Sequence, residues 1–183
     1  MVRLNKIYTK SGDKGKSSLC TGQRLYKFDP YFQAIGDIDE LNAHLGLIYA
    51  YIEDEHIQDL ICHIQNDLFD LGADLATPIS ETHALRIQKT QVGFLEQLIE
   101  QMNSILPPLN SFVLPRGSIL TSQIHITRTV CRRAERSIVY LNHTHKVNPN
   151  VLSYTNRLSD WLFVFARFTE KSEEILWQPA MFQ

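Results

Sequence analysis

The chain has 183 residues and a formal net charge of −2, so it lacks the broad basic excess of a general nucleic-acid binder. Hydrophobic residues make up 44% of it, enough for the core of one domain. No run of about 18 uncharged apolar residues is present, and residues 1–6 lack the apolar core of a signal peptide. These features predict one cytoplasmic domain with no nucleic-acid partner and no membrane partner.

Residues 1–28 differ from the rest and are expected to form an irregular arm. Within them, residues 10–18 combine glycines, hydroxyls and lysines without a helical period. Backbone amides freed by glycine, together with hydroxyl and ammonium groups, suit a triphosphate. The spacing from Gly12 to Gly15 is two residues too short for a P-loop, which excludes that motif. A flexible polar arm without a ligand has the same composition, so the loop alone does not decide.

Residues 29–183 show the hydrophobic period of five helices. The first is expected to begin near Tyr31, with Asp37 or Asp39 as its cap. The other four are expected over residues 56–75, 89–106, 118–142 and 150–171. Neither an internal repeat nor a linker divides the chain. The pattern predicts an all-α fold: an antiparallel five-helix bundle preceded by a nucleotide-binding arm, as one domain over residues 1–183.

The fourth predicted helix carries the strongest functional signal. Its charged stripe consists of Thr121, Ile124, Arg128, Arg132, Glu135 and Val139. The opposite stripe is apolar and consists of Ile119, Leu120, Ile126, Val130, Cys131, Ala134, Ile138 and Leu141. Arginine presents planar, permanently charged groups that fit phosphate oxygens, which favours an anion site. The alternative is a solvated face with ion pairs one turn apart.

The fifth predicted helix is apolar on most sides, which predicts a buried central position. Its polar residues Asn156, Asp160 and Arg167 are therefore expected to be paired or bound to a ligand. Cys62 and Cys131 are expected to pack in the core. Residue spacing indicates neither a catalytic nucleophile nor a protein-held transition metal. The residues alone indicate a helical bundle that holds a polyphosphate with its Mg²⁺.

Five short motifs resemble those of the PduO-type ATP:cob(I)alamin (corrinoid) adenosyltransferases, in the same order. They lie at residues 8–27, 36–42, 106–115, 128–136 and 156–163. Together they span nearly the whole chain, and the combination is far more specific than any one motif. The resemblance implies a homotrimer of five-helix bundles with active sites between subunits. It also implies transfer of the 5′-deoxyadenosyl group of MgATP to the cobalt of a reduced corrinoid, which forms adenosylcobalamin and releases triphosphate.

The resemblance further implies roles for individual residues. One subunit would wrap the ATP phosphates with Thr9, Lys10, Ser11, Gly12, Ser17, Ser18 and Lys27. Its neighbour would complete the ATP site with Arg132, Arg133, Glu135, Arg136 and Asn156. Asp39 and Arg128 match a salt bridge between subunits and, with Arg132 and Phe112, form the implied catalytic set. Phe112 matches the aromatic residue that excludes the lower axial ligand of cobalt, and Phe163 would also contact the corrinoid. Cobalt(I) itself is the implied nucleophile.

The chain departs from the family pattern at Phe28, Arg116 and Thr127, where the family has acidic, glycine and small apolar residues. Two alternatives remain open. A corrinoid carrier or sensor would bind both ligands without efficient turnover, but it has no need for Phe112. A structural oligomer would use its arginines only between subunits, but it has no use for the arm. A cobalamin reductase and an adenosylcobalamin-dependent enzyme are further implied partners.

Overall fold

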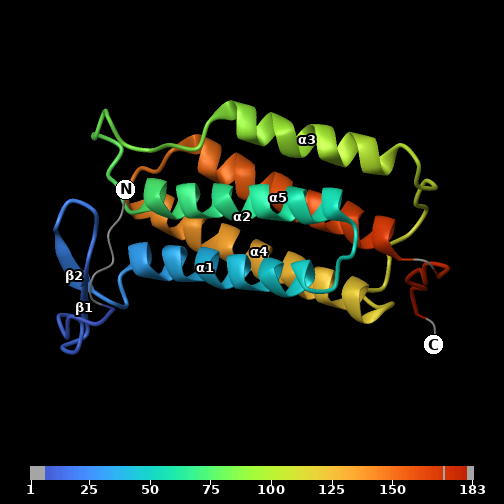
Figure 1. Ribbon diagram of the computed structural model, residues 1–183, viewed down its shortest axis with the longest axis horizontal. Coiled ribbons are helices and arrows are strands. Elements are labelled where there is room, and N and C mark those ends of the chain that lie inside the picture. The colour runs from blue at the N-terminus through green and yellow to red at the C-terminus, as the bar shows by residue number, and fades with distance from the viewer. Residues whose placement is uncertain (1–6, 171, 181–183) are drawn as a thin grey trace.

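The computed structural model describes residues 7–170 and 172–180, and in that part five long helices run alongside one another (Figure 1). They are α1 (Pro30–Tyr49), α2 (Glu55–Leu75), α3 (Lys89–Asn103), α4 (Ile119–Thr144) and α5 (Pro149–Thr169). The all-α bundle is thereby confirmed. The first six residues of the expected arm lie outside the described residues. None of the described helices is both long and apolar enough to cross a membrane.

The start of α1 differs from the prediction. Asp29 caps the helix, because its side chain accepts a hydrogen bond from the Tyr31 amide at 3.1 Å. Pro30 follows at the first helical position, where its fixed φ favours the helix and its missing N–H costs nothing. The predicted caps were wrong: Asp37 is buried in the middle of α1, and Asp39 is exposed there.

The other helix boundaries lie within two residues of the prediction, except at the end of α3. That helix ends at Asn103 rather than at residue 106. Two prolines, Pro107 and Pro108, follow, and a residue before proline is disfavoured in the helical region. The connection from α3 to α4 therefore runs without regular helix or strand over residues 104–118.

The core lies between α5 and its neighbours. α5 packs against α3 and α4, while α1 packs against α2 and α4. Tyr154, Trp161 and Phe165 of α5 are fully buried, which confirms the central position of this helix. Removing such large apolar side chains from water is the main term that stabilises the bundle.

The second half of α4 buries its predicted apolar stripe, with Cys131, Ala134, Ile138 and Leu141 inaccessible to solvent, but the first half departs from the prediction. Thr121 and Ile124, assigned to the charged stripe, are buried, whereas Ile119 and Ile126 are 72% and 49% exposed. A helical wheel gives the angle between side chains but not the direction of the neighbouring helices. Burying threonine costs little here, because the Thr121 hydroxyl is hydrogen-bonded to the Ser118 hydroxyl at 2.9 Å. Cys62 was also misplaced and is exposed, whereas Cys131 is buried as predicted.

The arm and the connection 104–118 occupy opposite ends of the bundle (Figure 1). The arm contains a small antiparallel hairpin, β1 (Lys16–Ser18) and β2 (Arg24–Tyr26), next to the start of α1. Leu19 anchors it in the core at 5% exposure. The C-terminal tail, residues 172–180, lies at the other end with the connection. α4 alone has 26 residues, so it spans about 39 Å between the two ends.

Candidate functional site

The arm folds residues 9–18 into a compact loop. The Gly15 amide donates to the Gly12 carbonyl at 3.1 Å, and the Lys27 amide donates to the Gly15 carbonyl at 2.9 Å. The Lys27 ammonium lies over Gly12, where an added Cβ would come within 3.2 Å of Nζ. Gly15 has a φ of 73°, a backbone conformation that other residues rarely adopt. The loop thus brings backbone amides and an ammonium group together.

The hydroxyl groups of the arm lie in the same loop. The hydroxyls of Thr9 and Ser11 are 2.7 Å apart, and Arg24 donates to the Ser11 carbonyl at 2.6 Å. Ser17 and Ser18 follow on β1. The cationic side chains of the arm are Lys10, Lys14, Lys16, Arg24 and Lys27. None of these cations forms a salt bridge within residues 7–170 and 172–180, so the loop keeps a concentrated positive charge.

The front of α4 adds an exposed cation and a bridge to α5. The Arg132 side chain is exposed and has neither a salt bridge nor a hydrogen bond in the described part of the chain. Arg136 donates to the Arg132 carbonyl at 3.0 Å. Asn156 donates its side-chain amide to Glu135 at 3.0 Å and accepts from Arg157 at 2.7 Å. The prediction that Asn156 is paired is confirmed.

Arg133 does not lie with Arg132. Its guanidinium forms a salt bridge with Glu40 of α1, and its Nε is 4.0 Å from the buried carboxylate of Asp37. Asp37 also accepts a hydrogen bond from the Ser137 hydroxyl. Sequence reasoning missed this cluster, although both carboxylates lie in the motif 36–42. The ATP-binding role of Arg133 stays a prediction.

Asp39 and Arg128 do not meet within one chain. Asp39 is exposed and lines a shallow groove between α1 and α2 with Phe69 and Gly72. Arg128 is partly buried, and its Nε has no hydrogen-bond partner in the described residues. Burial first, and the charge of Arg132 second, lower the pKa of Arg128. Within the described residues, neither group therefore forms a salt bridge.

Phe112 lies at the end of the bundle away from the arm. Its side chain is 78% exposed, and its ring centroid is 6.1 Å from that of Trp177 in the tail. Val113 pairs with Leu176 in an isolated antiparallel bridge. Phe163 is partly buried against the core on α5, so the structure gives it no open apolar face like that of Phe112.

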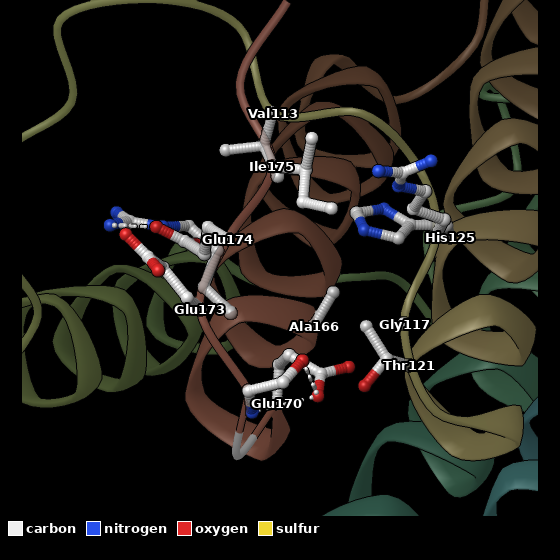
Figure 2. Close-up of a pocket in the computed structure, with 12 residues that line it drawn as sticks. Val113, Gly117, Thr121, His125, Ala166, Glu170, Glu173, Glu174 and Ile175 are labelled. Carbon is white, nitrogen blue, oxygen red and sulfur yellow. Dashed lines mark hydrogen bonds and ion pairs between the residues drawn. The ribbon is translucent and has the colours of Figure 1, made fainter.

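A cavity of about 360 Å³ lies behind the Phe112 segment, between α4, α5 and the tail (Figure 2). Figure 2 shows Val113 and Ile175 side by side on one wall and His125 projecting from α4. Its lining residues are Val113, Arg116, Gly117, Thr121, His125, Ala166, Arg167, Glu170, Ser172, Glu173, Glu174 and Ile175. Arg116, at which the sequence is expected to depart from the family pattern, is thus one of the residues that line the cavity.

The charged groups around this cavity are held by specific contacts. Arg167 pairs with Glu174 at 2.6 Å, which confirms its predicted pairing. Hydrogen bonds from the backbone amides of Ser118 and Ser172 lower the pKa of Glu170 to about 2. His125 is buried, and its Nδ1 has no partner in the described residues; burial and then Arg128 lower its pKa. Sequence reasoning missed this cluster, because no local pattern links the tail to α4.

The described residues form no protein-held metal centre at either end of the bundle. Among residues 7–170 and 172–180, no three His, Cys, Asp or Glu side chains are grouped closely enough to hold a metal ion. A divalent cation at the arm would therefore depend on oxygens of the bound phosphates for much of its coordination.

Comparison with known proteins shows which family this chain resembles in sequence. A family model described as cobalamin adenosyltransferase matches residues 7–169. A corrinoid adenosyltransferase of Mycobacterium leprae (strain TN) is 42% identical over 190 residues, covering 97% of this chain and 98% of that protein. A cobalamin adenosyltransferase of Cupriavidus metallidurans is 43% identical over 180 residues, covering 96% of each.

Solved structures of similar proteins agree with the fold. A phenylalanine-to-alanine variant of the PduO-type ATP:corrinoid adenosyltransferase from Lactobacillus reuteri, complexed with cobalamin and ATP, superposes with a TM-score of 0.90 at 37% identity. The match covers 94% of this chain and 99% of that one. An arginine-to-lysine variant of that enzyme, complexed with ATP, gives a TM-score of 0.88 at 38% identity and covers 94% of this chain and 100% of that one.

Proposed function

The chain belongs to the cobalamin adenosyltransferase family, and from this premise we propose how its residues divide the work of the reaction. The enzyme transfers the 5′-deoxyadenosyl group of ATP to the cobalt of a reduced corrinoid and releases triphosphate. Cobalt(I) is the nucleophile, so no side chain has to attack. The protein instead aligns C5′ with cobalt, neutralises the leaving triphosphate and excludes water.

The arm and the front of α4 hold the triphosphate. In the part of the chain that the structure describes, the arm cations form no salt bridge, and the exposed Arg132 side chain on α4 has neither a salt bridge nor a hydrogen bond. Hydroxyls of Thr9 and Ser11 and the ammonium of Lys27 lie at the same loop. Glu135 and Asn156 hold each other and fix the α4–α5 surface beside Arg132. Mg²⁺ enters with ATP, bound mainly by its phosphates.

Each active site lies between two copies of the chain, which form a homotrimer. The observation that carries this proposal is the placement of the arm and Phe112 at opposite ends of a bundle whose α4 spans about 39 Å. ATP at the arm and a corrinoid at Phe112 of the same chain could not react. The unpaired charges of Asp39 and Arg128 support the same arrangement, because a second copy can join them.

Phe112 faces the lower side of the corrinoid. Its exposed ring supports this role, because a core phenylalanine would be buried. An apolar ring at that place displaces the axial ligand of cobalt and offers no ligand in exchange, which makes cobalt(II) easier to reduce. The reaction takes place in the cytoplasm, with a cobalamin reductase supplying the electron and an adenosylcobalamin-dependent enzyme receiving the product.

Mixing two inactive variants tests the shared site. Lys27→Ala damages the arm and Arg132→Ala damages α4, so in a trimer of either variant alone every site has one damaged half. Co-assembly in equal amounts should leave about a quarter of all sites with both halves intact. Alkylation of cob(I)alamin by ATP, followed anaerobically by absorbance, should then recover about a quarter of the wild-type rate.

Two damaged arms provide the control. A mixture of Lys27→Ala with Ser11→Ala cannot create an intact site between subunits, so its rate should remain at the level of the separate variants. No recovery in the first mixture, despite proven co-assembly, would place the arm and Arg132 of one chain in the same site. If the wild type bound both ATP and the corrinoid without any turnover, the alternative function as a corrinoid carrier or sensor would be supported instead.

A further inference from the structure

Burial alone does not hold Phe112 in place. The ring is 78% exposed, and it lies in a connection without regular helix or strand. An exposed side chain on such a segment samples several rotamers, because no neighbouring atoms restrict it. A ring that blocks one side of a cobalt ion must keep a defined position. Some other contact must therefore restrict it.

The tail provides that contact. The Trp177 amide donates to the Phe112 carbonyl at 2.7 Å, and the Leu114 amide donates to the Ile175 carbonyl at 2.8 Å. The Ser111 hydroxyl also donates to the Trp177 carbonyl at 2.8 Å. The Phe112 and Trp177 rings are 6.1 Å apart and inclined by 54°, within the range of attractive aromatic pairs. Trp177 thus touches both the backbone and the ring of Phe112.

The tail and the Phe112 segment are both attached to the end of α5. The buried guanidinium of Arg167 donates to Glu174 of the tail at 2.6 Å and to the Pro107 carbonyl at 2.7 Å. Glu170 accepts from the Ser118 amide at 2.8 Å, at the other end of the same segment. Arg167 and Glu170 therefore hold the backbone of the Phe112 segment from the end of α5, and Trp177 contacts the Phe112 ring itself.

We infer that Trp177 is a positioning residue for Phe112 in the reduction of cobalt(II). This inference rests on the proposed role of Phe112. Trp177 does not touch the reacting atoms; it restricts the ring that displaces the lower axial ligand. Without its indole, the ring leaves that position part of the time, and less bound cob(II)alamin loses the ligand. One-electron reduction of cobalt(II) by an external reductant then slows, whereas transfer to cobalt(I) supplied ready-made does not.

Two assays of Trp177→Ala in the full chain test the inference. With cob(II)alamin and a chemical reductant, the rate should fall about fivefold, the effect of losing one aromatic contact. With pre-reduced cob(I)alamin, the rate should change less than about twofold. Trp177→Phe retains a ring and should recover most of the loss. Gln178→Ala, next to Trp177 but without a hydrogen bond to Phe112 in the described residues, serves as the matched control and should behave as wild type.

A spectroscopic readout separates positioning from folding. The electron paramagnetic resonance spectrum of bound cob(II)alamin with ATP should show a smaller ligand-free fraction in Trp177→Ala, at an unchanged melting temperature. Equal losses in both assays, a wild-type rate with cob(II)alamin or a lowered melting temperature would overturn the inference. Phe112→Ala serves as the reference: if it also loses both rates equally, the proposed role of Phe112 fails as well. A selective loss in Phe112→Ala but not in Trp177→Ala would overturn the role of Trp177 alone.

Discussion

The two ends of the bundle, which we propose bind the two substrates, differ in how their charged groups are paired. At the arm end, the cations of residues 10–27 form no salt bridge in the described chain, and two three-residue strands shape the loop. At the tail end, Arg167 is paired with Glu174, and Glu170 caps the backbone of Ser118. The arm cations therefore lack opposite charges in the described residues, whereas Arg167 and Glu170 at the tail end already have partners there.

This difference follows from the chemistry of the two substrates. A triphosphate brings several negative charges that can organise a mobile cationic loop around them. A corrinoid presents a broad, largely apolar ring whose metal must be approached from one side, which requires a surface that exists beforehand. The comparison predicts that removing a charge that contacts the triphosphate damages the arm side, while changing the shape of the surface damages the tail side.

The largest effect is expected from removing Arg132, which we propose to face the triphosphate. Arg132→Ala should lower kcat/KM about 100-fold, the usual loss when one preorganised donor to developing charge is removed. Arg132→Lys keeps the charge but loses the planar pair of donors, so its loss should be about tenfold. Lys14→Ala, which removes an exposed arm cation outside the predicted ATP site, should stay within about twofold of wild type. Equal losses for the Lys14 and Arg132 variants would show that ATP binding depends on overall positive charge and not on a specific contact from Arg132.

The next largest effect is expected from the proposed salt bridge between Asp39 of one copy and Arg128 of another. Arg128→Asp should weaken trimer assembly by about 2 kcal/mol, roughly 30-fold, below the figure for a fully buried pair because Asp39 is exposed in one chain. Sedimentation over a range of protein concentrations measures this change. Combining Arg128→Asp with Asp39→Arg restores opposite charges and should recover assembly. A fully active monomeric wild type would refute the arrangement.

Phe112→His sharpens the comparison at the tail end. A histidine offers cobalt a ligand, so activity that depends on cobalt(II) reduction should fall more than tenfold, or more than about 1.4 kcal/mol of barrier. Activity with pre-reduced cob(I)alamin should fall much less, and ATP affinity should stay within about twofold. Parallel assays with the two oxidation states measure the selectivity. Joint loss of both activities with a lowered melting temperature would assign Phe112 to the core instead.

Hydrogen exchange compares the two ends directly. MgATP should slow exchange of backbone amides in residues 9–18 about tenfold, because the phosphates occupy hydrogen-bonding groups of the loop. Amides of residues 174–177 should change by less than about twofold, because the tail is already paired. The same measurement on Arg132→Ala provides a control with weakened ATP binding. Equal protection of the arm with and without MgATP would contradict the comparison.

The smallest effect is expected at the Glu170 cap. Its pKa of about 2 lies below its usual value, so its stabilisation is complete above pH 4.5 and declines as the pH falls towards 2. Because the group is partly exposed, the contribution should be below about 1 kcal/mol. Urea unfolding between pH 6 and pH 3 should show a smaller pH-dependent loss in Glu170→Gln than in the wild type. Identical profiles would show that this cap does not stabilise the fold.

Periodicity and local chemistry predicted much of the molecule. Five apolar periods located the helices to within about three residues, because a helix buries one face at a fixed repeat. The apolar character of α5 predicted its central position, and its polar residue Arg167 proved to be paired. The composition of the arm predicted a loop of cations and hydroxyls, although not the hairpin that shapes it.

The tertiary structure alone decided which groups meet across the chain. Ile126 and Thr121 exchanged their expected environments, because a helical wheel does not give the direction from which the neighbouring helices approach the first half of α4. Arg133 lies against Glu40, although both belong to motifs associated with ligand binding. Trp177 touches Phe112 across 65 positions of sequence. The local sequence pattern determines which residues share a face of each helix. Contacts between distant residues depend on how those faces pack against one another. The packing therefore decides which side chains stay available to contact the substrates.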